Sequence, residues 1–109
     1  MRAEVRFVIA DENSFMGPGT KDLLENIKTT SSIKGASRAM NMSYNKALHM
    51  LQNMEKELGM PVVDSQKGGY DRGGTVLTPV GEKVLKLYTQ IEQRVEAYAQ
   101  KLVDEKFVV

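Results

Sequence analysis

The 109-residue sequence has no cysteine and no long apolar run. Without cysteine there is no disulfide framework and no thiolate metal site, which is typical of proteins of the reducing cytosol. The N-terminal apolar stretch, Val5–Ala10, is short and interrupted by Arg6, so it is neither the core of a signal peptide nor a membrane span. We expect a cytoplasmic protein without a membrane partner. A hydrophobic content of 41% supports one core, and we expect a single domain over residues 1–109.

Acidic residues are missing from one long stretch, Asn26–Met54, although the chain contains 14 of them. An acid-free surface with basic side chains is typical of nucleic-acid binding, and a solvated surface that happens to lack acids is the alternative. Because the net charge of the whole chain is only +1, attraction to phosphate must be local. The basic residues and the histidine of this stretch are Lys28, Lys34, Arg38, Lys46 and His49.

The same stretch has the spacing of two short helices joined by a tight turn. We expect a first helix over Ser32–Met40 with Ser32 as its N-cap. Asn41 tolerates the left-handed backbone that ends a helix, and Ser43 is the N-cap of the second helix. The apolar residues of the second helix form one stripe, at Ala47, Leu51, Met54 and Leu58. This pattern predicts a helix-turn-helix.

A glycine-rich segment, residues 66–74, lies between two short β runs that begin at Val62 and Thr75. It lacks the Gly-Lys-Ser or Gly-Lys-Thr ending and the following helix that a phosphate-binding loop requires. We therefore predict a β-hairpin, the wing of a winged helix-turn-helix. Its Lys67 and Arg72 are expected to reach the DNA backbone or a minor groove, with a simple connector as the alternative.

At the N-terminal end we expect a strand over Ala3–Ala10, a short return strand at Phe15–Met16, and a helix over Thr20–Thr29 with Thr20 as N-cap. At the other end, Thr78 and Pro79 begin a helix that we expect over residues 79–103. Its apolar residues follow a heptad pattern, at Val84, Tyr88, Ile91, Val95, Tyr98 and Leu102. This seam predicts a dimerisation helix and a homodimer, and packing on the chain's own domain is the alternative.

The residues favour no enzymatic function. His49 is the single histidine, and no pair of carboxylates occurs in an apolar setting. The seven methionines lie at helical core spacing, so we interpret them as core residues and not as a soft-metal site. We expect no catalytic residue, no metal and no cofactor.

The predicted fold is mainly α with small β (α+β): a winged helix-turn-helix with an N-terminal strand pair, a glycine-rich wing and a long C-terminal helix. The predicted function is sequence-specific DNA binding by a homodimeric transcriptional regulator, whose partners are double-stranded DNA and a second copy of the chain. A winged-helix protein-interaction module is the alternative. The expected DNA contacts are Ser32, Lys34, Arg38, Ser43, Tyr44, Asn45, Lys46, His49, Lys67 and Arg72.

Several of these motifs resemble known regulators. The helix-turn-helix and the sequence Met54–Val63 look like the DNA-binding domain of LysR-type regulators. The Ser43-Tyr44 opening, the long wing and Val76-Leu77-Thr78 are more similar to the N-terminal domain of the molybdate-responsive ModE family. This resemblance implies DNA-binding transcriptional regulation. Because the sequence ends at Val109, we expect no effector-binding domain and no molybdate site in this chain.

Overall fold

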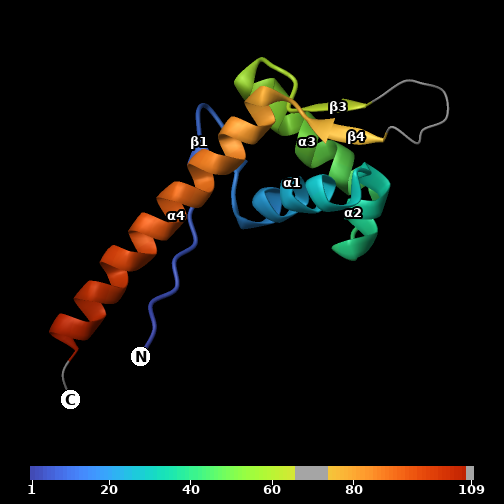
Figure 1. The fold of residues 1–109 in the computed structure, drawn as a ribbon. Coiled ribbons are helices and arrows are strands. Elements are labelled where there is room, and N and C mark those ends of the chain that lie inside the picture. Colours follow the sequence, from blue (N-terminus) through green and yellow to red (C-terminus); the bar gives the residue numbers. More distant parts are fainter. Residues whose placement is uncertain (66–73, 108–109) are drawn as a thin grey trace.

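The computed structural model describes residues 1–65 and 74–107 of the chain (Figure 1). The predicted wing residues Lys67 and Arg72 lie outside the described residues. The elements, in chain order, are β1 (Ile9–Ala10), β2 (Ser14–Met16), α1 (Pro18–Thr30), α2 (Ile33–Ala39), α3 (Tyr44–Leu58), β3 (Val63–Ser65), β4 (Thr75–Leu77) and α4 (Pro79–Lys106).

Helices α1, α2 and α3 pack around one core, and α4 extends away from it as a long arm (Figure 1). The N-terminal segment runs beside α4, and β4 packs against α1 and the start of α4. The structure confirms the predicted winged helix-turn-helix of the α+β class. The fully or almost fully buried apolar residues of the three helices are Leu23, Leu24, Ile27, Ala36, Ala47, Leu51 and Met54.

The helix-turn-helix forms as predicted because local hydrogen bonds define its ends. The Ser32 hydroxyl oxygen accepts a hydrogen bond from the Gly35 amide at 2.8 Å. The Ser43 hydroxyl oxygen accepts one from the Lys46 amide at 3.0 Å. Between the two helices Asn41 has a φ of 55°, the left-handed conformation that was expected of it.

The predicted start of the first helix is wrong. Thr20 lies inside α1, and Gly17 is the N-cap residue, without a side-chain hydrogen bond. Pro18 takes the first helical position, where its missing N–H costs no hydrogen bond and its fixed φ suits the helix. The helix therefore begins two residues before the predicted cap.

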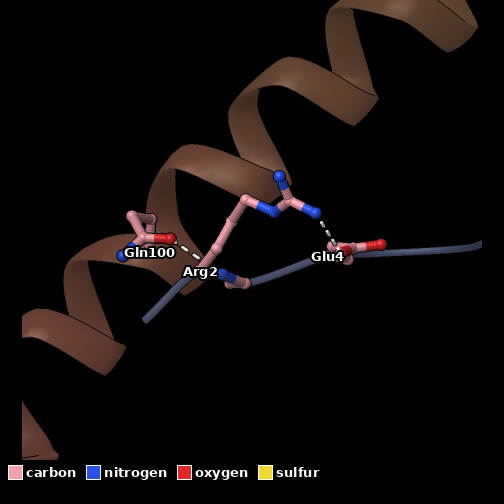
Figure 2. A network of polar contacts seen from close by, with 4 residues as sticks. Arg2, Glu4 and Gln100 are labelled. Carbon is pink, nitrogen blue, oxygen red and sulfur yellow. Dashed lines mark hydrogen bonds and ion pairs between the residues drawn. The ribbon is translucent and has the colours of Figure 1, made fainter.

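The predicted N-terminal strand is mostly replaced by an extended segment on α4. Only Ile9 and Ala10 pair with β2. Further towards the N-terminus, the side-chain amide of Gln100 accepts a hydrogen bond from the Ala3 amide at 2.8 Å and donates one to the Met1 carbonyl at 3.0 Å. Figure 2 shows Gln100 beside this segment, where Arg2 and Glu4 also form an ion pair. The element beside residues 3–8 is a helix and not a strand. Their backbone therefore bonds to side chains of α4 and forms no β ladder.

The wing base and α4 follow the prediction. Strands β3 and β4 are antiparallel, with Val63 opposite Leu77 and Ser65 opposite Thr75. The Thr78 hydroxyl oxygen accepts from the Gly81 amide at 3.1 Å, and α4 continues to Lys106, three residues beyond the expected end. No helix in residues 1–65 and 74–107 combines the length and apolar character that crossing a bilayer requires.

Candidate nucleic-acid interface

Helix α3 separates an inward apolar face from an outward polar face. Ala47, Leu51 and Met54 are buried against the other helices, as the stripe predicted. The side chains at the start of the helix are left on the outside because they fall between these buried positions. Four of the predicted contacts are exposed there, at Tyr44, Asn45, Lys46 and His49.

The two predicted serines cap helices, which limits what else they can contact. Ser32 is half-buried and Ser43 is exposed, and the oxygen of each accepts a backbone hydrogen bond. Each hydroxyl still has its own hydrogen to donate. Ser32 and Ser43 can therefore orient their helices and donate to an anion at the same time.

Helix α2 presents its two basic residues to solvent. Lys34 and Arg38 are exposed, while Ser37 between them is buried and its hydroxyl donates to the Lys34 carbonyl at 2.8 Å. No carboxylate of a described residue lies within 4.0 Å of the charged groups of Lys34, Arg38 or Lys46. These three cations are therefore not neutralised by the described part of the chain.

Lys28 behaves differently, although it belongs to the same acid-free stretch of sequence. Its ammonium group lies 2.9 Å from a carboxylate oxygen of Glu82, at the start of α4. The sequence interpretation missed this pair because the two residues are 54 positions apart. The acid-free surface is thus confined to α2 and the start of α3, where Lys34, Arg38 and Lys46 lie.

The wing base is attached directly to the helix-turn-helix. The Thr75 amide donates to the Ser31 carbonyl at 2.8 Å. Gly74 has a φ of 65°, and a Cβ at this position would lie 2.1 Å from the Ser31 oxygen. The sequence interpretation missed this contact, although the last glycine of the wing was its signal. The attachment holds the wing base at the α1–α2 junction, across a groove from the first residues of α2 and α3, where a wing must lie to accompany a recognition helix.

The residues of the predicted dimer seam differ in how exposed they are in the structure. Tyr88 is fully buried in its own chain, so it is not available to a second copy and this part of the prediction is wrong. Val84 and Ile91 are partly buried. Further along α4, Val95, Tyr98 and Leu102 are exposed, with 40%, 64% and 36% of their surface accessible.

Metal-ligating side chains do not gather in groups in the described part of the chain. No three His, Asp or Glu side chains in residues 1–65 and 74–107 lie together in a way that could hold a metal ion. The outward face of α3 and the basic residues of α2 are instead suited to hydrogen bonding and charge attraction.

Comparison with known proteins identifies the family. Residues 22–82, more than half of the chain, match the model of the bacterial regulatory helix-turn-helix proteins of the lysR family. The chain belongs to this family. The matched residues include α2, α3 and the wing base, so the family match covers the surface described above.

Individual relatives agree with this assignment. The molybdenum-pterin-binding protein MopB of Rhodobacter capsulatus is 43% identical over 77 residues, which are 71% of this chain and 28% of that protein. The transcriptional regulator ModE of Haemophilus influenzae is 34% identical over 91 residues, which are 84% of this chain and 36% of that protein. The chain therefore spans about a third of the length of these relatives.

A solved structure supports the lysR-family fold. The crystal structure of VV2_1132, a LysR family transcriptional regulator, superposes with a TM-score of 0.59 at 15% sequence identity. The match covers 78% of this chain and 28% of that one. At this identity the likeness concerns the fold alone.

Proposed function

We propose that this chain binds double-stranded DNA in a sequence-specific manner, as the DNA-binding part of a transcriptional regulator. The observation that carries the proposal is the outward face of α3, where Asn45, Lys46 and His49 are exposed beside the unneutralised cations of α2. A helix of this kind fits the major groove, where base edges present distinct donors and acceptors. Membership of the lysR family supports the same function.

The chemistry of each side chain indicates whether it contacts a base or a phosphate. An Asn side chain can form two hydrogen bonds with the edge of an adenine, so we assign base reading first to Asn45. Lys34 and Arg38 lie on α2, which crosses the backbone in helix-turn-helix proteins, so we assign them to phosphates. Lys46 and His49 are exposed on α3 with Asn45, and we assign them to base edges or nearby phosphates.

The regulator is further proposed to work as a homodimer through the distal part of α4. Val95, Tyr98 and Leu102 are exposed apolar side chains on a helix that projects from the core. The N-terminal segment lies along α4 and is held there by Gln100, so a second copy would pack on the face that this segment leaves open. Cyclic dimers with self-complementary surfaces are the commonest soluble oligomers.

The proposal is tested by fluorescence anisotropy with labelled duplexes, including one selected by the protein from genomic fragments. If two copies together contact about six to ten phosphates, the affinity falls by roughly 10³ to 10⁵ between about 50 and about 200 mM salt. Lys34→Ala lowers the steepness of this salt dependence. Lys106→Ala, which removes an equal charge at the far end of α4, leaves it unchanged.

A flat salt response, or equal slopes for Lys34→Ala and the wild type, would contradict the proposal. Binding to no duplex at all would favour the alternative, a winged-helix module that binds another protein. The net charge of +1 is the observation that favours this alternative, because a nearly neutral domain has no general attraction for nucleic acid.

A further inference from the structure

A surface groove of about 610 Å³ separates the start of α2 from the base of the wing. Its walls come from the α1–α2 junction, the first turn of α3 and the two wing strands. Six of the eight described lining residues carry polar side chains, and Ile33 and Gly74 complete the lining. The polar residues are Ser31, Ser32, Lys34, Tyr44, Ser65 and Thr75.

The groove is built by backbone contacts between segments distant in sequence. Ser31 ends α1 in the left-handed conformation, with a φ of 57°, and its carbonyl accepts the Thr75 amide. Gly74 lets the two backbones approach at a distance that a Cβ would prevent. The spacing between the helix-turn-helix and the wing is therefore set by the structure and not by a flexible linker.

Several hydrogen-bond donors of the groove have no acceptor among the described residues. Ser65 and Thr75 lie 3.3 Å apart, and because one hydroxyl donates to the other, the pair retains one hydrogen for a ligand. The Ser32 oxygen accepts from Gly35, which leaves its hydrogen free to donate. The side chains of Ser31, Lys34 and Tyr44 make no hydrogen bond to any described side chain or backbone group.

The charged groups among the lining residues indicate which class of ligand the groove suits. Lys34 supplies an ammonium group, and no Asp or Glu is among the described lining residues. Hydroxyl groups together with an ammonium group and without a carboxylate suit an oxyanion, because its oxygens accept several charge-assisted hydrogen bonds.

We propose that this groove holds one phosphate of the DNA backbone, between the helix-turn-helix and the wing. The inference rests on the proposed function, because the groove opens beside the start of α3, where the duplex backbone flanks the major groove. It adds Ser31, Ser65 and Thr75 to the predicted interface. It also assigns Tyr44 to a phosphate and leaves base reading to Asn45 and its neighbours.

The first test uses the full chain and removes one hydroxyl at a time. Tyr44→Phe loses the hydroxyl of an exposed residue and keeps the ring. The fold is therefore retained, and the circular dichroism spectrum remains unchanged. Loss of one hydrogen bond to a charged oxygen weakens binding about tenfold, to the selected duplex and to a mixed-sequence duplex alike. Ser65→Ala weakens both less, because Thr75 keeps its hydroxyl hydrogen for the ligand. Ser14→Ala, an exposed serine of β2 outside the groove, serves as the matched control and changes neither affinity.

The second test places an uncharged methylphosphonate at each backbone position of the selected duplex in turn. Several positions per half-site weaken wild-type binding, and at one of them the same substitution weakens Tyr44→Phe much less, because that contact is already lost. This lack of additivity identifies the phosphate in the groove. Titration with inorganic phosphate in the absence of DNA, followed by NMR of the Ser31 and Thr75 amides, distinguishes a DNA phosphate from a free anion.

Three outcomes would overturn the inference while the proposed function stands. Tyr44→Phe could weaken only the selected duplex, which would make Tyr44 a base-reading residue. The methylphosphonate effects could add fully to that of Tyr44→Phe. Inorganic phosphate could shift the groove amides while no methylphosphonate position matters, which would make the groove a free-anion site. Failure of the wild type to bind any duplex would overturn the proposed function together with the inference.

Discussion

The ring of Phe7 stacks on the ring of Tyr88, with 4.2 Å between the centroids and 12° between the planes. The Tyr88 hydroxyl also donates to the Phe7 carbonyl at 2.8 Å. The extended N-terminal segment is thus attached to α4 by an aromatic stack and a hydrogen bond between the same two residues. This contact explains why Tyr88, which follows the heptad pattern, faces its own chain.

Removal of the Tyr88 hydroxyl tests this attachment. Tyr88→Phe keeps the stack and leaves the Phe7 carbonyl without its donor, so the free energy of unfolding falls by about 1 kcal/mol. Tyr88→Ala also removes the ring and costs about 3–5 kcal/mol. Urea unfolding followed by circular dichroism measures both. Tyr98→Phe, on the exposed part of α4, is the control and changes the value by less than about 0.5 kcal/mol.

The same residue predicts a loss of stability at alkaline pH. Burial raises the pKa of the Tyr88 hydroxyl above its ordinary value, and the nearby Glu92 carboxylate adds to the effect. The folded state therefore holds this proton more tightly than the unfolded state. The resulting stability is complete below a pH of about 10 and is lost as the pH rises through the raised pKa. Urea midpoints measured over this range fall less for Tyr88→Phe than for the wild type, and equal slopes would contradict the prediction.

Two glycines with left-handed backbones provide a matched test of the wing attachment. Gly74 and Gly59 have φ values of 65° and 71°, but only at Gly74 would a Cβ meet the Ser31 oxygen. Gly59→Ala therefore costs about 1 kcal/mol of unfolding free energy from backbone strain alone. Gly74→Ala costs more, or separates the wing from α2, and it lowers DNA affinity. Equal DNA affinity of the two variants would show that the attachment does not matter for binding.

Base reading is tested by comparing Asn45→Ala with Lys34→Ala. Loss of a base contact costs about 1–3 kcal/mol at the selected site and relaxes the preference at one or two base pairs. Loss of a phosphate contact weakens all sequences alike. Anisotropy on the selected duplex and on a mixed-sequence duplex separates the two patterns. If Asn45→Ala weakens both duplexes equally, Asn45 does not read bases.

The proposed dimer is tested on the exposed part of α4. Val95→Asp places a charge in the proposed apolar interface, where an unpaired carboxylate costs several kcal/mol, so the dimer dissociates at micromolar concentration. Gln93→Asp introduces the same side chain on an exposed position of the opposite face and leaves the dimer intact. Sedimentation velocity measures both, and a monomeric wild type would refute the interface.

The local elements of this protein were determined by the sequence itself. The caps at Ser32, Ser43 and Thr78 each accept a hydrogen bond from an amide three residues later, so they depend only on neighbours. The stripe of α3 is equally local, because helical spacing alone places its residues on one face. The error at the start of α1 was also local, since Pro18 outweighed Thr20 as the signal for the first turn.

The tertiary structure decided everything that depends on residues far apart in the chain. Lys28 is paired because α4 brings Glu82 to it, and Tyr88 is buried because the N-terminal segment lies along the same helix. The groove between α2 and the wing base exists because Gly74 brings Thr75 to Ser31. Periodicity along one segment cannot show such contacts, because it contains no information about which other segment covers a given face.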